Sequence, residues 1–156
     1  SGQWVPIDEI ALLGFRVATK SAQTNRNSVI VSAADPDLVL TSLLPGRYQV
    51  EILVHLGGVA AGGFRWQLKN SAGAATGSIS SWGFINGAWA SGVIVDMNTD
   101  VLYTDLSGGN FEWIRISAWV NVTSTATISF AWAQESTNIT NTSVFLGNFT
   151  ATIIDP

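Results

Sequence analysis

The chain has 156 residues, of which 47% are hydrophobic and 12% charged, and it contains no cysteine. A chain of this length and composition buries a sizeable core as one domain, which excludes disorder. The 7 Lys and Arg residues against 11 Asp and Glu residues give a net charge of -4. The basic surface that nucleic acids and acidic membranes require is therefore missing. We expect no nucleic-acid partner and no membrane insertion.

The chain divides into residues 1–14, predicted to be an N-terminal connecting segment, and residues 15–156, predicted to be a single domain. Within the first segment, Ile7, Ile10 and Leu13 recur at helical spacing, which predicts a short helix. The start at Ser1 without an initiator Met indicates a fragment of a longer protein.

Alternation with a period of two residues dominates the rest of the chain. Residues 47–56 alternate apolar and polar side chains, which predicts a strand with one apolar face. Residues 111–120 are largely apolar on both faces, which predicts a strand covered on both sides, and residues 125–135 are predicted to be its hairpin partner. Further predicted strands are Phe15 to Lys20, Val29 to Ser32, Asp37 to Ser42, Phe64 to Asn70, Ser78 to Ile85, Gly92 to Met97, Val101 to Asp105 and Val144 to Ile154.

The strands are short and closely spaced, and clusters of Gly, Pro, Asp and Asn separate them. About ten strands of this kind predict an all-β fold, a jelly-roll β-sandwich. The uncharged, small-residue stretch at residues 70–81 is interpreted as a long surface loop.

Enzymatic chemistry has little support in the sequence. His55 is the only histidine and lies in the middle of a predicted strand, and no Gly-x-Ser-x-Gly turn is present. The turn-like segment from Asp96 resembles the start of a calcium loop, but Val101 and Ser107 replace its Gly and Glu. Solvated turn carboxylates are the preferred interpretation of Asp96, Asp100, Asp105 and Glu112. We expect no catalytic residues, no metal and no cofactor, and hence no enzyme.

The 7 tryptophans are the most informative residues. Indole faces stack on sugar rings and on one another, so a ligand-binding site for a glycan is predicted in a Gly/Ser-rich loop region at Trp82, Phe84, Asn86 and Trp89. The tryptophans in alternating strands are predicted to pack in the core or in a subunit interface: Trp66, Trp113, Trp119 and Trp132.

Two segments resemble domains of tailed-bacteriophage virion appendages. The first runs from Asp37 to Glu51 and contains Leu44-Pro45-Gly46-Arg47-Tyr48. The second comprises Ile128 to Asn138, with Trp132-Ala133-Gln134, and the closing Val144 to Thr150. The similarity covers nearly the whole chain, from Phe15 to Ile154.

The resemblance implies a C1q/TNF-like jelly roll that forms homotrimers at the tips of tail fibres or head fibres, on the virion surface. The partners it implies are further copies of the chain, other virion proteins and a host cell-surface glycan, bound by avidity. The predicted trimer interface is Phe111, Trp113 and Trp119, or else the opposite strand face with Ile114 and Ile116. The alternative function is a monomeric, non-viral carbohydrate-binding module.

Overall fold

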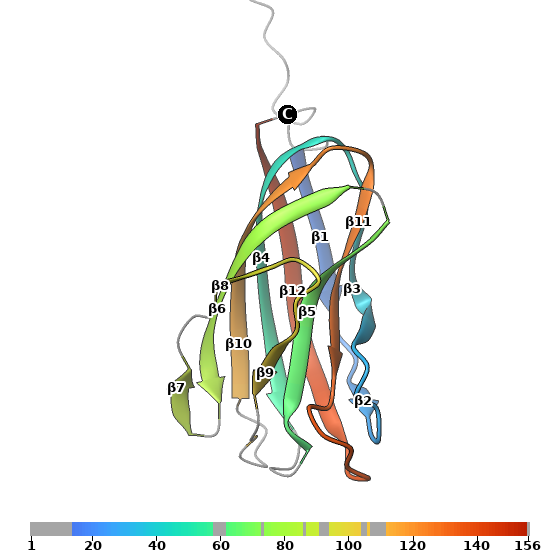
Figure 1. Ribbon diagram of the computed structural model, residues 1–156, viewed down its shortest axis with the longest axis vertical. Helices are drawn as coiled ribbons and strands as arrows, with labels where there is room; N and C mark the ends of the chain where they lie inside the picture. The colour runs from blue at the N-terminus through green and yellow to red at the C-terminus, as the bar shows by residue number, and fades with distance from the viewer. Residues whose placement is uncertain are drawn as a thin grey trace, which may run out of the picture.

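The computed structural model describes residues 14–57, 62–72, 74–85, 87–90, 94–103, 106 and 112–155. These residues form strands β1 to β12, arranged as two antiparallel sheets that pack face to face (Figure 1). The structure confirms the predicted all-β, jelly-roll-like sandwich. The predicted short helix at residues 7–13 lies outside the described residues.

The larger sheet has eight strands and the smaller has four. In sheet order, the larger contains β1 (Phe15–Lys20), β12 (Thr142–Asp155), β4 (Gly46–Gly57), β10 (Glu112–Val122), β6 (Ala75–Ile85) and β7 (Ala88–Ala90), with β2 (Thr24–Arg26) paired to β12 and β8 (Ile94–Asp96) paired to β6. The smaller contains β3 (Ala33–Leu43), β11 (Ala126–Ala133), β5 (Phe64–Ala72) and β9 (Val101–Tyr103).

Period-two alternation decides which side chains enter the core. Along β4, every second side chain from Tyr48 to Leu56 is buried. The smaller sheet contributes large aromatic rings to the other side of the core. Phe64, Phe130 and Trp132 are fully buried, and the ring of Phe64 stacks on the other two with centroids 6.4 and 5.7 Å apart. Each such ring buries about 150–250 Å² and dominates the packing energy. The core therefore lies entirely between the two sheets.

The predicted hairpin between residues 111–120 and 125–135 is wrong. Strand β10 lies between β4 and β6 in the larger sheet, whereas β11 lies between β3 and β5 in the smaller sheet. The turn at residues 123–125 therefore crosses from one sheet to the other. Each strand has an apolar face that points into the core. These two faces meet across the core from opposite sheets, whereas in a hairpin they would lie next to each other in one sheet.

Two local predictions also need correction. Residues 29–32 precede β3 as a connection in which residues 29–31 are exposed and Ser32 is buried, and the strand on that side is the unpredicted β2. Residues 70–72 end β5 and residues 75–81 belong to β6, where their backbones pair with β11 and β10. Strand pairing uses the main-chain N–H and C=O groups, which small residues supply as well as large ones. In the described part of the chain no helical segment is long and apolar enough to cross a lipid bilayer.

Both ends of the described chain lie at the same pole of the sandwich, since Phe15 pairs with Thr152 near the end of β12 (Figure 1). The opposite pole is formed in part by the β2–β3 and β11–β12 connections. These two connections are joined where Ser28 N–H donates to the carbonyl of Asn138 at 2.8 Å and Gln134 N–H donates to that of Val29 at 2.9 Å. We call this end the free pole.

Gly83 allows β6 to approach β10 closely. A Cβ at this position would overlap the carbonyl oxygen of Trp113 and lie 3.0 Å from the Cα of Ile114, and both are backbone atoms that cannot move aside. We expect Gly83→Ala to lower the free energy of unfolding by about 1–3 kcal/mol. Chemical denaturation measures this. Ser78→Ala, at an exposed position of the same strand, is the matched control and should change it by less than about 0.5 kcal/mol. Equal stability of the two variants would contradict the close approach.

Candidate functional site

The outer face of the larger sheet has no partner among the described residues, and it carries half of the large exposed hydrophobic side chains found in them. We define the outer face by the outward side chains of β1, β12, β4, β10, β6 and β7. Strand register aligns them in rows. From the pole with the chain ends to the free pole, the rows are Phe15, Thr152, Gln49, Trp119 and Ser78; Val17, Thr150, Glu51, Ser117 and Ser80; Thr19, Asn148, Leu53, Arg115 and Trp82; and Leu146, His55, Trp113, Phe84 and Trp89.

Four aromatic rings at the β10–β6–β7 side of this face form what we call the tryptophan cluster: Trp82, Phe84, Trp89 and Trp113. Trp113 is its centre, with ring centroids 5.5 Å from Trp82 and 5.6 Å from Trp89, both edge to face. Phe84 and Trp89 meet in the same way at 5.9 Å. Edge-to-face contacts of this kind fix the rings relative to one another. The cluster is therefore an ordered surface, although Trp89 is 70% exposed.

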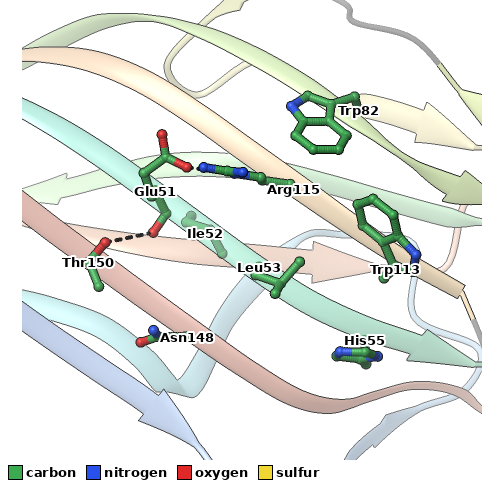
Figure 2. A pocket seen from close by; sticks show the side chains of 9 residues that line it. All are labelled: Glu51, Ile52, Leu53, His55, Trp82, Trp113, Arg115, Asn148 and Thr150. Atoms are coloured by element: carbon green, nitrogen blue, oxygen red, sulfur yellow. Dashed lines mark hydrogen bonds and ion pairs between the residues drawn. The ribbon is translucent and has the colours of Figure 1, made fainter.

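A shallow groove of about 500 Å³ runs beside the tryptophan cluster across β12, β4, β10 and β6 (Figure 2). Aromatic and aliphatic side chains share its lining with polar groups, of which Glu51, Asn148 and Thr150 lie toward one side and His55 toward the other. The lining residues are Glu51, Ile52, Leu53, His55, Trp82, Trp113, Arg115, Asn148 and Thr150. Aromatic faces beside a few fixed polar groups are the usual composition of a site for small molecules.

The polar side of the groove is organised around Glu51. Its carboxylate accepts from Arg115 Nε at 2.8 Å and from Ser117 Oγ at 2.8 Å, and the Arg115 guanidinium in turn lies 5.4 Å from the ring of Trp82. Burial raises the pKa of the Glu51 carboxyl, but the hydrogen bonds from Arg115 and Ser117 and the charge of Arg115 together hold it below its ordinary value. The groove thus contains a fixed, internally neutralised ion pair.

The sequence-predicted ligand residues and the sequence-predicted interface residues meet on this one face. Trp82, Phe84 and Trp89 lie in strands β6 and β7, not in a loop. The rings of Trp82 and Trp89 contact Trp113 from the interface set, and the ring of Phe84 contacts Trp89. Trp119 lies on the same face, away from the cluster, and is 62% exposed. Asn86 and Phe111 lie outside the described residues.

The opposite face of β10 does not line an interface. Ile114 and Ile116 are fully buried in the core, so the alternative trimer face predicted for them is wrong. The strand is also not covered on both sides within the chain, because Arg115 and Trp119 are exposed. The physical reason is that the inward face of β10 is the one needed by the sandwich.

Several residues of the site were not predicted from the sequence. Glu51, Leu53 and Arg115 line the groove, and Asn148 enters it from β12. The available signal was the alternation itself, because the positions between the buried residues of β4 and β10 must all point to one surface. Which strands lie beside them was not readable from the sequence.

Acidic side chains do not gather into a metal site anywhere in the described ranges, where no three His, Asp or Glu residues could hold an ion together. Asp100 instead accepts from Ser32 Oγ at 2.9 Å and pairs with Arg65. Glu112 is buried at the start of β10, Asp96 is exposed, and Asp105 lies outside the described residues.

The free pole carries a second exposed apolar surface. Val29, Ile30 and Val31 are 40 to 73% exposed in the β2–β3 connection, and Ile139 in the β11–β12 connection is 87% exposed. Hydrogen bonds between the two connections hold these residues at one end of the molecule. The free pole is therefore an ordered loop surface remote from both ends of the described chain.

No family model matches the chain, and no curated protein sequence matches it. Among solved structures, it is similar to the VP2 subviral particle of infectious bursal disease virus, with 10% identity, a TM-score of 0.21, and coverage of 91% of this chain and 42% of that chain. The structure of the Gx strain of the same virus gives 12% identity and a TM-score of 0.16, again over 91% and 42% of the two chains. The chain spans less than half the length of these proteins, and a likeness this remote carries no functional argument.

The Glu51–Arg115 pair makes the free energy of unfolding depend on pH. The folded-state pKa of Glu51 lies below the ordinary value of 4.5. The ionised carboxylate therefore adds to the free energy of unfolding above pH 4.5, and this addition is lost as the pH falls through the folded-state pKa. We expect Glu51→Gln to lower the free energy of unfolding by up to about 1 kcal/mol near neutral pH. This difference should shrink on acidification. Denaturation curves across this range measure it, with Arg115→Gln as the background in which the effect should shrink to the part that the Ser117 hydrogen bond supplies. A difference that does not change with pH would contradict the assignment.

Proposed function

We propose that this domain is a structural and host-attachment module of a bacteriophage virion appendage, a tail fibre, spike or capsid decoration, which assembles as a homotrimer through the outer face. The single observation that carries the proposal is the ordered, aromatic and aliphatic outer face of the larger sheet. The sequence resemblance to virion appendage domains from Phe15 to Ile154 supports the same function.

The outer face has the properties of a surface that another protein covers. Phe15 and Val17 on β1, Leu53 on β4 and Trp119 on β10 are each between 42 and 62% exposed. Exposed apolar patches of more than a few hundred Å² mark interaction sites in soluble proteins. Strands about 4.8 Å apart give this face an area of the same order as the about 800 Å² that each partner buries in a stable interface.

A further copy of the chain is the partner that fits this face best. Apolar side chains occupy the rows of Phe15 and of Leu146, and a polar row of Thr150, Glu51 and Ser117 lies between them. Closed rings of identical subunits need such mixed, largely uncharged surfaces, and only 12% of the chain is charged. The expectation of three copies, in place of another number, comes from the sequence resemblance to virion appendage domains.

Attachment to the host would then use the free pole, which assembly through the outer face leaves uncovered. Both ends of the described chain lie at the opposite pole, where other virion proteins would join. Copies held side by side present their free poles together, so several weak contacts to a cell-surface glycan add up to firm binding through avidity.

The oligomeric state tests the proposal. Light scattering coupled to size exclusion should give about three times the monomer mass of 16.6 kDa. Leu53→Lys and Trp119→Lys place a charge in the outer face and should reduce that mass to the monomer value, because a buried unpaired charge opposes association.

Ile139→Lys adds the same charge at the free pole and is the matched control, which should remain trimeric. Circular dichroism confirms that each variant is folded. A wild-type monomer at high protein concentration would refute the assembly.

The groove favours one second candidate, the monomeric carbohydrate-binding module. Trp82 and Trp113 offer ring faces, and Glu51, Arg115 and Asn148 offer hydrogen-bonding groups for sugar hydroxyls. This function requires the outer face to be free in solution, so it competes with assembly through that face.

A glycan array with the purified protein tests the second candidate. If the groove binds sugar, Trp82→Ala should weaken binding about tenfold or more through loss of ring stacking. Trp119→Ala, on the same face but outside the groove, should leave binding unchanged. A monomer that binds glycans in this pattern would place the second candidate first, and equal effects of both substitutions would exclude the groove.

A further inference from the structure

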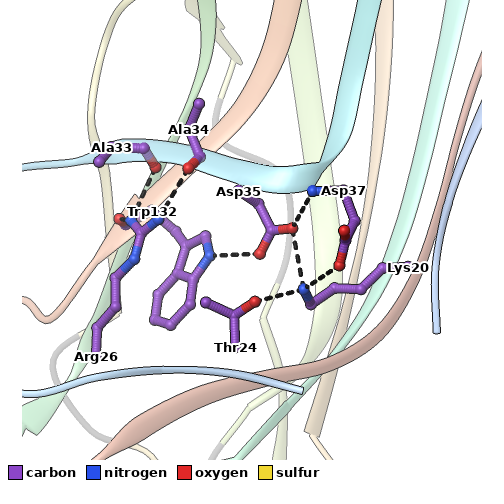
Figure 3. A network of polar contacts seen from close by, with 8 residues as sticks. All are labelled: Lys20, Thr24, Arg26, Ala33, Ala34, Asp35, Asp37 and Trp132. Carbon is purple, nitrogen blue, oxygen red and sulfur yellow. Dashed lines mark hydrogen bonds and ion pairs between the residues drawn. The ribbon is translucent and has the colours of Figure 1, made fainter. Parts of the chain in front are cut away.

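A buried ionic cluster joins the two sheets near the β1 edge, and neither assembly nor sugar binding uses it (Figure 3). Lys20, the last residue of β1, is 1% exposed, and Asp35 in β3 is fully buried. Lys20 Nζ lies 3.1 Å from Asp35 Oδ1 and 3.0 Å from Asp37 Oδ2, and it also contacts Thr24 Oγ1. We call these residues, together with Trp132, the Lys20 cluster.

The Asp35 carboxyl group is held in one orientation by donors on both oxygens. Trp132 Nε1 donates to Oδ2 at 3.0 Å, and the backbone N–H of Asp37 donates to Oδ1 at 3.1 Å, the same oxygen that meets the Lys20 amine. Trp132 itself is fully buried, and the guanidinium of Arg26 stacks on its ring at 4.3 Å. The amine and the carboxyl carbon are therefore fixed next to each other in a site that excludes bulk water.

A second carboxyl group stands at the solvent side of this pair. The side chain of Asp37 is 40% exposed, whereas those of Lys20 and Asp35 are 0% exposed. Asp37 can therefore exchange protons with solvent while it touches the buried amine. A nucleophile, an acceptor carbon and a proton carrier are the three groups that amide formation requires.

We propose that Lys20 and Asp35 form an intramolecular isopeptide bond after folding. A proton passes from the Lys20 ammonium to Asp37, and the neutral amine attacks Cγ of Asp35. The Nζ–Cγ bond forms and the Cγ–Oδ1 bond breaks. Two of the three ammonium protons, passed on by Asp37, leave with Oδ1 as one water molecule, and Asp37 ends in its starting state.

The remaining contacts suit both the reaction and its product. Oδ2 becomes the amide carbonyl oxygen, and the Trp132 N–H that already faces it stabilises the negative charge that develops there. The amide N–H keeps Asp37 as its acceptor. Two buried charges are costly to keep out of water, and one hydrogen-bonded amide replaces them.

Proximity supplies the driving force. Amide formation from separate molecules in water is unfavourable, but groups held in contact react as if at about 10⁵–10⁸ M. Exclusion of water from the cluster also opposes the reverse reaction. The product would tie β1 of the larger sheet to β3 of the smaller sheet covalently, whatever the oligomeric state.

Intact-mass spectrometry of the denatured wild-type protein tests the bond. We expect a mass lower than the sequence mass by one water molecule. Trypsin should leave the chain uncut after Lys20 and yield residues 17–26 covalently joined to residues 27–47. A folded wild-type protein with its full sequence mass would overturn the proposal and leave the Lys20 cluster an ion pair only.

Four variants complete the test. Lys20→Met and Asp35→Ala should show the full mass of their sequences. Lys69→Met, which removes an amine from β5 outside the cluster, should keep the loss of one water. Asp37→Asn should accumulate the unlinked protein, and a fully linked Asp37→Asn protein would overturn the proton-transfer role of Asp37.

Discussion

The packing of the aromatic layer of the smaller sheet against the aliphatic layer of the larger one is the interaction on which the rest of the structure depends. Phe64, Trp66, Phe130 and Trp132 are fully buried, and the inward residues of β4 and β10 meet them across the core. Loss of one such ring costs about 3–5 kcal/mol, a large fraction of the stability of a domain. The inward set is therefore fixed, and everything that alternates with it is directed outward.

This constraint explains the outer face. A strand that places Ile114 and Ile116 in the core must place Trp113 and Arg115 on the surface, because successive side chains point to opposite sides of a sheet. The neighbouring strands obey the same rule, so their outward residues form continuous rows. The tryptophan cluster and the groove beside it are consequences of strand order, and they share one surface. A partner that covers this surface, whether another copy or a sugar, excludes the other.

The same packing creates the Lys20 cluster. Trp132 fills the core with its ring and directs its Nε1 toward Asp35, so a core residue also positions a buried carboxyl group. Lys20 ends β1 at the place where the two sheets come together, and its side chain reaches between them to β3. A buried ion pair of this kind contributes little net stability. The proposed reaction between Lys20 and Asp35 would give the cluster a larger stabilising role than the ion pair itself.

The sequence by itself determined the fold class and most of the strands, because alternation is a local property that each strand carries independently. It placed β1 at Phe15–Lys20 with its true bounds and β4 within one residue of them. It also identified Trp82, Phe84, Trp89, Trp113 and Trp119 as the residues of interest, although it divided them between two separate sites. Only the tertiary structure decided that β10 and β11 lie in different sheets, that Trp82 meets Trp113, and that Lys20 meets Asp35. The physical reason is that strand pairing depends on contacts between distant segments, and inward faces of similar hydrophobicity do not specify which strands become neighbours.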